Sequence, residues 1–253
     1  MTSSAPLSLY EHAVLITGGA RRLGAAMART LHGAGCRVMI HHRDSAAAAQ
    51  ALVDELNSLR AGSAASVAAD LNDLAVLPGI VAATISAFGR LDVLVNNAST
   101  FYPTPIGEIT AAQFDDLLGS NLRAPLFLSQ AAAPALRQHG GLILNMVDIH
   151  AFRPLKRHPV YSAAKAGLAM LTQSLARELA PEIRVNGIAP GPVMWPEGEM
   201  DADLQARIIE RTALKRIGSA DDIARAALFF VRDAPYVTGQ ILPVDGGRTV
   251  SGF

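Results

Sequence analysis

One stretch decides the fold of this chain: AVLITGGARRLG, residues 13–24. A short apolar run leads into a glycine turn, and a helical pattern begins at about Leu23 and continues to Gly33. Glycines at such a turn let the backbone approach a pyrophosphate, which the free N–H groups and the dipole at the helix start stabilise. The alternative is a plain strand–helix turn that needs glycine for its backbone angles. The position after a first strand favours the phosphate site.

Further apolar or β-branched runs predict strands along the rest of the chain, with helical patterns between them. These runs lie near residues 37–42, 65–70, 91–96, 141–147, 183–189 and 240–244. Strands that alternate with helices form right-handed crossovers, and hence a parallel sheet with helices on both faces. We therefore predict one α/β domain over residues 1–253, a Rossmann-type doubly wound parallel sheet of about seven strands. Residues 191–215 are expected to form a substrate loop at the ligand edge of the sheet.

Composition excludes several classes of protein. Half of the 253 residues are hydrophobic and 17% are charged, which is typical of a compact globule. The 22 basic and 22 acidic residues balance, so nothing favours a nucleic-acid or membrane partner. Cys36 is the only cysteine, so no intrachain disulfide can form and a reducing compartment is expected. With no signal-peptide pattern or membrane-length apolar run, we expect a soluble, cytoplasmic protein.

A tyrosine and a lysine stand four residues apart in the segment Tyr161-Ser-Ala-Ala-Lys165. On a helix this spacing puts both side chains on one face, where the ammonium can help the phenol give or take a proton. A solvated helix face is the commoner reading of such a pair. If the pair is functional, the nearby positive charge is expected to lower the pKa of Tyr161 toward neutral pH, although a charged Asp148 would act in the opposite direction.

The end of the second predicted strand indicates which dinucleotide the chain prefers. An NAD site usually has an acidic residue there to hold the ribose 2′-hydroxyl, but this strand ends with His42-Arg43-Asp44. Arg43, helped by Arg22 in the glycine loop, could clamp a 2′-phosphate. Asp44 complicates this reading, and any single arginine is often only surface charge. Two arginines placed by separate motifs favour NADP(H).

Three further signals fall where a dinucleotide fold would use them. Asp70-Leu71 follows the third strand, where a carboxylate could accept from an adenine amino group or could instead cap a helix. Asn96-Asn97-Ala98 follows the fourth strand, at the edge where ligands bind in open α/β sheets. Asn121 lies in a helical stretch, where an amide is unfavourable unless its side chain has a partner. Each of these three signals is weak by itself, but their order and spacing together favour a dinucleotide-binding fold.

Over nearly its full length the chain resembles the short-chain dehydrogenases/reductases. The matching residues are Thr17, Gly18, Gly24, Asp70, Asn96, Asn97, Ala98, Asn121, Tyr161, Lys165, Pro190 and Gly191. The resemblance implies that Tyr161 donates a proton, that Lys165 holds the nicotinamide ribose and lowers the tyrosine pKa, and that Asn121 anchors a water. It also implies a homotetramer and no metal. The cofactor-binding set it implies is Gly18, Arg21, Arg22, Leu23, Gly24, His42, Arg43, Asp70, Leu71, Asn97, Ala98, Ser99, Tyr161, Lys165, Pro190, Gly191 and Val193.

Two departures from the family pattern are informative. Arg22 stands where a third glycine is usual, and Asp148 stands where a serine normally polarises a substrate carbonyl. A carboxylate repels a developing alkoxide but suits the N–H and amino groups of a nitrogen heterocycle, and a protonated carboxyl can donate to a ring nitrogen. This combination is similar to the pteridine reductase branch, in which an arginine-bearing loop accompanies an aspartate at the serine position.

That resemblance extends to the run Asn97-Ala-Ser-Thr-Phe-Tyr-Pro-Thr-Pro105. It implies that Ser99 contacts the pterin and a cofactor phosphate and that Phe101 stacks on the pterin, although ordinary loop packing is the alternative for Phe101. Trp195 could line the pocket or merely pack. The expected substrate-binding set is Ser99, Phe101, Asp148, Tyr161 and Trp195, with Asp148, Tyr161, Lys165 and Asn121 as catalytic residues.

The sequence therefore predicts an NADPH-dependent pteridine reductase acting on dihydropterin or dihydrofolate-type substrates. A carbonyl reductase of the same family, acting on ketones, sugars or acyl thioesters, is the nearest alternative. A non-catalytic NADP(H)-sensing protein on the same fold is an alternative of another class.

Overall fold

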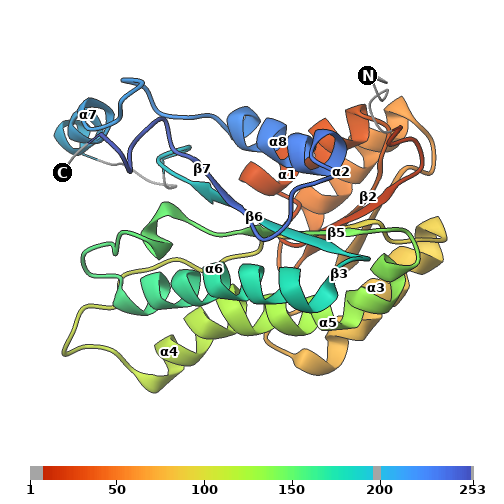
Figure 1. Ribbon diagram of the computed structural model, residues 1–253, viewed down its shortest axis with the longest axis horizontal. Helices are drawn as coiled ribbons and strands as arrows, with labels where there is room; N and C mark the ends of the chain where they lie inside the picture. The colour runs from red at the N-terminus through yellow and green to blue at the C-terminus, as the bar shows by residue number, and fades with distance from the viewer. Residues whose placement is uncertain (1–7, 196–200, 252–253) are drawn as a thin grey trace.

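Seven parallel strands form a single sheet in the order β3-β2-β1-β4-β5-β6-β7, as the computed structural model of the chain shows (Figure 1). The structure describes residues 8–195 and 201–251. The strands are β1 (Ala13–Ile16), β2 (Arg37–His42), β3 (Ala64–Ala68), β4 (Val93–Asn96), β5 (Leu142–Met146), β6 (Arg184–Pro190) and β7 (Ile241–Val244). The predicted doubly wound α/β fold with about seven strands is confirmed. The observed boundaries differ from the predicted ones by at most two residues.

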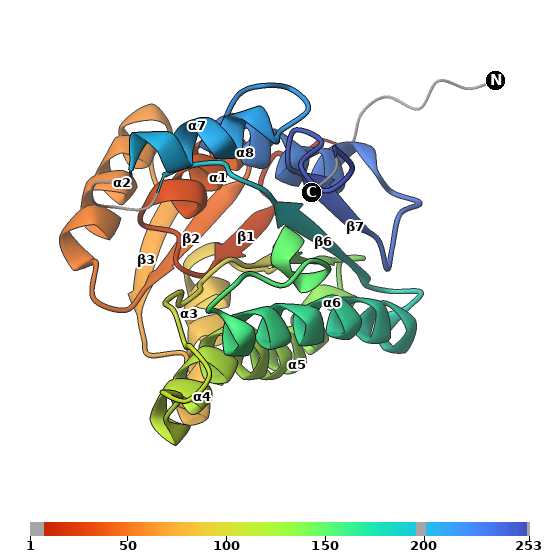
Figure 2. The ribbon, with the colours of Figure 1, turned by 90° about the vertical axis from the view of Figure 1, so that its left-hand side faces the viewer.

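Helices cover both faces of this sheet (Figures 1 and 2). One layer holds α1, α2 and α8, and the other holds α3, α5 and α6. The helices are α1 (Arg22–Gly33), α2 (Ala46–Leu59), α3 (Leu77–Phe88), α4 (Ala111–Leu118), α5 (Ala124–Arg137), α6 (Pro159–Leu179), α7 (Ala202–Glu210) and α8 (Ala220–Leu228). Short 3₁₀ turns, η1 (Leu74–Val76) and η3 (Ile149–Ala151), and π-helical turns, η2 (Gly119–Arg123) and η4 (Phe229–Asp233), complete the described elements.

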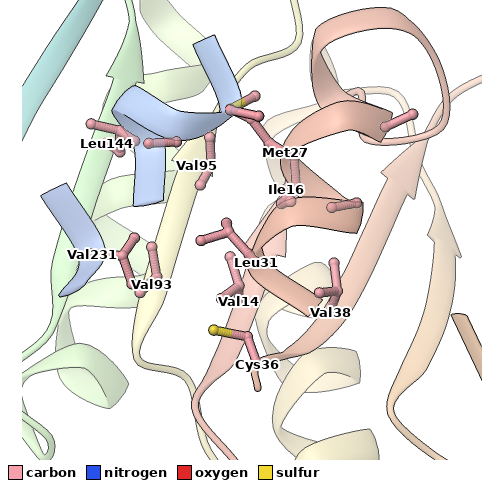
Figure 3. Packing of buried hydrophobic residues seen from close by; sticks show 14 of the residues in the cluster. Val14, Ile16, Met27, Leu31, Cys36, Val38, Val93, Val95, Leu144 and Val231 are labelled. Atoms are coloured by element: carbon pink, nitrogen blue, oxygen red, sulfur yellow. The ribbon is translucent and has the colours of Figure 1, made fainter. Parts of the chain in front are cut away.

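The central strands are apolar on both sides because each face of the sheet has its own core. Val14 and Ile16 of β1 pack with Met27 and Leu31 of α1 in one cluster, as Figure 3 shows. Leu15 belongs to the second cluster, on the other face. Burying one such side chain contributes about 1.5–3 kcal/mol, so alternate residues of β1 fix the strand between two helical layers.

The strand order reverses at β1, which has β2 on one side and β4 on the other. Chains that leave the carboxyl ends of two such strands turn to opposite faces, and they leave a crevice where ligands bind in open α/β sheets. The glycine turn after β1 and the segment after β4 meet at this point. The fold thus places the predicted phosphate loop at a ligand-binding edge.

The predicted substrate loop, residues 191–215, is partly helical. Helix α7 begins after Asp201, whose side chain accepts a hydrogen bond from the N–H of Asp203. Residues 196–200 lie outside the described part of the chain. Among the described helices, none is both long and apolar enough to cross a membrane.

Candidate active site

The ends of β1 and β4 are joined by hydrogen bonds. The Thr17 hydroxyl accepts from the N–H groups of Asn97 at 2.9 Å and Ala98 at 3.0 Å. The Asn97 amide donates to the carbonyls of Thr17 at 2.8 Å and Gly18 at 3.0 Å. Asn97 therefore holds the glycine loop against β4. Asn96, by contrast, points into the sheet and donates to Asn145 at 2.8 Å.

The glycine loop leaves no room for a Cβ at Gly24 and very little at Gly18. A Cβ on Gly24 would lie 2.3 Å from the Gly18 carbonyl oxygen, and one on Gly18 would lie 3.0 Å from the Ala98 Cα. Gly18 also has a φ of +58°, which is a left-handed conformation. The loop therefore keeps a bare backbone at the start of α1. This cradle fits a dinucleotide pyrophosphate.

Arg22 takes the left-handed conformation itself, with a φ of +50°. Glycine adopts these backbone angles without cost and few other residues do. This accounts for the glycine that the pattern of the short-chain dehydrogenases/reductases has at the position of Arg22. Its guanidinium donates to the Trp195 carbonyl at 3.0 Å. The structure therefore brings the backbone of Trp195 to the glycine loop.

A cavity of about 410 Å³ runs along the carboxyl ends of the strands beside this loop. It brings together twelve members of the predicted cofactor-binding set: Gly18, Arg21, Arg22, Leu23, Gly24, His42, Arg43, Asp70, Leu71, Asn97, Ala98 and Ser99. Val193 instead lines a second cavity, of about 360 Å³. Pro190 ends β6, and Gly191 lies so close to β7 that a Cβ on it would be 2.5 Å from the Asp245 Cβ.

Arg43 and Asp44 form an ion pair at the edge of the first cavity. Arg43 Nε lies 2.7 Å from Asp44 Oδ2, and the side chains are 53% and 79% exposed. The hydrogen bond to Asp44 raises the pKa of Arg43. Exposed pairs of this kind contribute at most about 1 kcal/mol, so a phosphate dianion can replace Asp44 as the partner of the guanidinium.

The sequence reasoning missed His41, which lies between the glycine loop and the third strand. Its ring is 2% exposed, its Nδ1 accepts from the Gly18 N–H at 3.2 Å, and its Nε2 lies 3.1 Å from the Ala69 carbonyl. Burial lowers the pKa of His41 to about 4. The ring is therefore neutral, with its proton on Nε2, and it links two walls of the cavity. The signal in the sequence was a histidine that directly follows the apolar residues of β2.

Asp70 forms a turn at the end of β3. Its exposed carboxylate accepts from the N–H of Asn72 at 2.9 Å. The suggestion that Asp70 caps a helix was wrong, because Asp73 caps η1 by accepting from the N–H of Ala75 at 3.0 Å. Asp70 remains at the rim of the cavity.

At the other end of the site, Tyr161 meets Asp148. The phenol donates to Asp148 Oδ2 at 2.7 Å, and Oδ1 of the same carboxylate accepts from the N–H of His150 at 2.8 Å. Asp148 is held at the end of β5 because it caps η3, while Tyr161 lies in the first turn of α6. Two residues separated by 13 positions are thus joined directly; the sequence predicted both for the site but did not predict this hydrogen bond.

The expectation that the pKa of Tyr161 is lowered was wrong. Burial, with 5% of the residue exposed, and the adjacent Asp148 carboxylate raise the pKa of Tyr161 well above its ordinary value, while Ser99 acts weakly in the opposite direction. Lys165 Nζ lies 5.7 Å from the centre of the tyrosine ring and donates to the Met146 carbonyl at 2.9 Å. Burial lowers the pKa of Lys165 to about 8. In this structure Lys165 therefore does not offset the effect of Asp148 on the pKa of Tyr161.

Asn121 sits in the π-helical turn η2 and is 0% exposed. Its amide nitrogen donates to the carbonyls of Leu117 and Thr100, both at 3.0 Å, and its oxygen accepts from the Ser99 hydroxyl at 2.7 Å. The expectation that a helical amide needs partners is confirmed. These bonds fix the β4–α4 loop over the site. The role of Asn121 in anchoring a water stays a prediction.

Phe101 lies on the same loop and is 50% exposed. Its ring stacks on His158, with centroids 4.7 Å apart and planes at 8°, and lies 4.9 Å from the Tyr161 ring in a T-shaped arrangement. Ser99, Phe101, Asp148 and Tyr161 are therefore gathered, while the described contact of Trp195 is with Arg22. Sequence reasoning also missed His158. Within the described residues, no group of three or more acidic, histidine or cysteine side chains could hold a metal.

Comparison with known proteins assigns the family. The family model described as enoyl-(acyl carrier protein) reductase matches residues 18–249, from the glycine loop to the end of the last strand and beyond. The chain is a short-chain dehydrogenase/reductase. It is therefore an oxidoreductase of a family whose members use NAD(P)H, in agreement with the cradle at the start of α1.

Relatives in this family cover almost the whole chain. Pteridine reductase 1 of Leishmania tarentolae is 37% identical, over 94% of this chain and 96% of its own length. L-Rhamnose 1-dehydrogenase (NAD(P)(+)) of Azotobacter vinelandii is 36% identical, over 96% of this chain and 98% of its own. L-Xylulose reductase of Caenorhabditis elegans is 34% identical, over 92% of this chain and 94% of its own length. Because the names include a pteridine and two sugars, the choice of substrate depends on the residues of the site.

Proposed function

We propose that this short-chain dehydrogenase/reductase is an NADPH-dependent pteridine reductase, which reduces dihydropterin or dihydrofolate-type substrates to their tetrahydro forms. The observation that carries the proposal is the hydrogen bond between Tyr161 and Asp148, at 2.7 Å. The family's tyrosine is here paired with a carboxylate instead of a serine hydroxyl.

The carboxylate decides which substrates suit the site. A ketone that is being reduced develops negative charge on oxygen, and Asp148 would repel that charge. A pterin presents ring N–H and amino groups, which a carboxylate accepts. Asp148 keeps its place because η3 begins there and the His150 N–H holds Oδ1, so a substrate would meet a fixed carboxylate.

Tyr161 is the proposed proton donor. Its raised pKa keeps the phenol protonated near neutral pH, so the phenol carries the proton that reduction of the substrate requires. When bound, the nicotinamide supplies the hydride. Tyr161 and Asp148 would then assist protonation of the ring nitrogen next to the pyrazine carbon that receives the hydride. Lys165, which donates to the Met146 carbonyl, is proposed to hold the nicotinamide ribose.

NADPH is the proposed cofactor because cations border the cavity at the end of β2. Arg43 and Arg22 would bind the 2′-phosphate, and the bare backbone at Gly18 and Gly24 would admit the pyrophosphate. The remaining residues proposed to hold the cofactor are Arg21, Leu23, His42, Asp70, Leu71, Asn97, Ala98, Ser99, Tyr161, Lys165, Pro190, Gly191 and Val193.

The substrate would lie against the exposed part of Phe101, beside the Tyr161–Asp148 pair. Ser99 is part of this group because its hydroxyl holds Asn121, for which we propose the water-anchoring role. Trp195 and the described parts of the substrate segment, residues 191–195 and 201–215, are proposed to border the site; residues 196–200 lie outside the described part of the chain. We also propose a homotetramer, consistent with the apolar Phe127 on α5 and Met170 on α6, which are 37% and 65% exposed.

One observation favours a second candidate, a carbonyl reductase: two of the similar proteins act on sugars according to their names. Asp148 speaks against this candidate. A non-catalytic NADP(H)-sensing protein is disfavoured because Tyr161, Lys165 and Asn121 are all present and ordered in the site.

The experiment is a comparison of NADPH consumption with dihydrobiopterin, dihydrofolate and a simple ketone at equal concentrations. The proposal requires faster turnover of a dihydropterin or dihydrofolate than of the ketone. Faster turnover of the ketone would support the carbonyl reductase. NADPH binding without turnover of any of the three would support the sensing protein.

A further inference from the structure

His158 stands at the start of α6, but its side chain makes no capping hydrogen bond to the helix. Residues at this position usually cap the helix with a side-chain oxygen. The imidazole instead lies flat on Phe101, with ring centroids 4.7 Å apart and planes inclined by 8°. Its Nδ1 lies 2.9 Å from the Lys156 carbonyl, to which it donates. Two contacts therefore fix the orientation of the His158 ring.

The backbone beside His158 is tied to the loop that carries Phe101. The Arg157 carbonyl accepts from the N–H of Thr104 at 2.7 Å. Arg157 has a φ of +67°, a left-handed conformation that is uncommon for residues other than glycine. Strained residues of this kind persist where the surrounding structure holds them. The loop and the start of α6 are thus joined by a backbone bond and by the stacked rings.

This arrangement leaves half of the Phe101 surface exposed. His158 covers one face of the ring, and the Tyr161 ring lies 4.9 Å away in a T-shaped arrangement at 79°. Since Phe101 is 50% exposed, its uncovered part offers an apolar surface to a flat ring. We propose that His158 is a positioning residue that braces Phe101, and that this brace makes the site select flat aromatic heterocycles over open-chain carbonyl compounds. The inference rests on the proposed function, because it concerns the same substrate site.

The physical reason is preorganisation. An exposed phenylalanine without a neighbour loses rotamer freedom when a substrate orders it, which weakens binding. Because His158 already orders the Phe101 ring in the free protein, substrate binding no longer causes this loss of rotamer freedom. From the usual strength of an aromatic pair, losing the brace should raise KM for a flat substrate about three- to tenfold. Because the described ring contacts of His158 do not include Asp148, kcat should change less than twofold.

The test compares His158→Leu, which removes the stacking ring, with His158→Phe, which restores an aromatic ring. Dihydrobiopterin turnover is measured with saturating NADPH, together with quenching of biopterin fluorescence by the NADP⁺-loaded protein. We expect His158→Leu to raise KM and the biopterin Kd by three- to tenfold with little change in kcat, and His158→Phe to return both to within twofold of native. The NADPH Kd and the thermal midpoint should be unchanged. His139→Leu, at an exposed position after α5, is the matched control.

The outcomes separate this inference from the proposed function. If the native protein reduces dihydrobiopterin and His158→Leu leaves KM unchanged, or lowers kcat alone, the role of His158 is overturned and the function stands. If KM and the biopterin Kd of His158→Phe stay as high as those of His158→Leu, the role of His158 as a brace is also overturned. A native protein that neither binds biopterin nor reduces dihydrobiopterin overturns the proposed function, and with it the selection of pterins by His158.

Discussion

Replacing His41 with asparagine should make the protein less sensitive to mild acid. The neutral His41 ring accepts from Gly18 and donates to Ala69, so a proton on Nδ1 would oppose the Gly18 N–H inside the protein. Asparagine keeps an acceptor for Gly18 but does not titrate. The substitution therefore removes the charge change while it retains part of the contact.

The magnitude follows from the pKa of His41, which burial lowers from 6.5 to about 4. Between these values the unfolded chain binds a proton that the folded protein does not bind. The stabilisation is therefore present above pH 6.5 and is lost as the pH falls toward about 4. At about 1.4 kcal/mol per pKa unit, the free energy of unfolding should fall by about 2 kcal/mol between pH 7 and pH 5 through His41 alone.

The assay is urea unfolding of native and His41→Asn protein at pH 7 and pH 5, followed by circular dichroism. The native protein should lose about 2 kcal/mol more than the variant over this interval. Burial also lowers the pKa of His32, so that residue destabilises both proteins in acid and cancels in the difference. Equal losses in the two proteins would refute the reasoning that His41 is held neutral between the two walls of the cavity.

Three further predictions concern the cofactor and the proton donor. Gly24→Ala should abolish measurable NADPH binding in calorimetry, because its Cβ would lie 2.3 Å from the Gly18 carbonyl oxygen; native-like affinity would refute the cradle. Arg43→Ala should weaken NADPH by about 1.5–3 kcal/mol and leave NADH nearly unchanged, and equal weakening of both would remove Arg43 from the 2′-phosphate site. Tyr161→Phe should keep the NADPH Kd but reduce turnover about 10²–10⁴-fold, and turnover within a few fold of native would exclude the phenol as the proton donor.

Much of the fold could be predicted from the sequence because the decisive signals are local. The run at residues 13–16 is apolar throughout because β1 is buried on both faces, and the glycine turn follows it directly. The helical part of the substrate segment was missed, since α7 lies in a stretch rich in proline and acidic residues that is typical of a loop.

The site was predicted less completely, because its properties depend on contacts between distant segments. Spacing put Tyr161 and Lys165 on one helix, but the pKa of Tyr161 depends on its burial and on Asp148, which reaches it from the end of β5. His41 and His158 carry no motif. Their roles appear only when the loops after β1 and β4 fold against them. The cytoplasmic location and the tetramer stay predictions.

The most direct test of pteridine reduction is the rate of NADPH oxidation with dihydrobiopterin and with a simple ketone, for native and Asp148→Ser proteins at saturating NADPH. Serine removes the carboxylate that holds the Tyr161 hydroxyl and restores the residue usual for a carbonyl substrate. The account predicts that the native protein reduces dihydrobiopterin faster than the ketone. It also predicts that the turnover of dihydrobiopterin is at least about tenfold lower in Asp148→Ser than in the native protein, while the NADPH Kd is unchanged. A native protein that reduces the ketone, ignores dihydrobiopterin and is unaffected by the serine would contradict it.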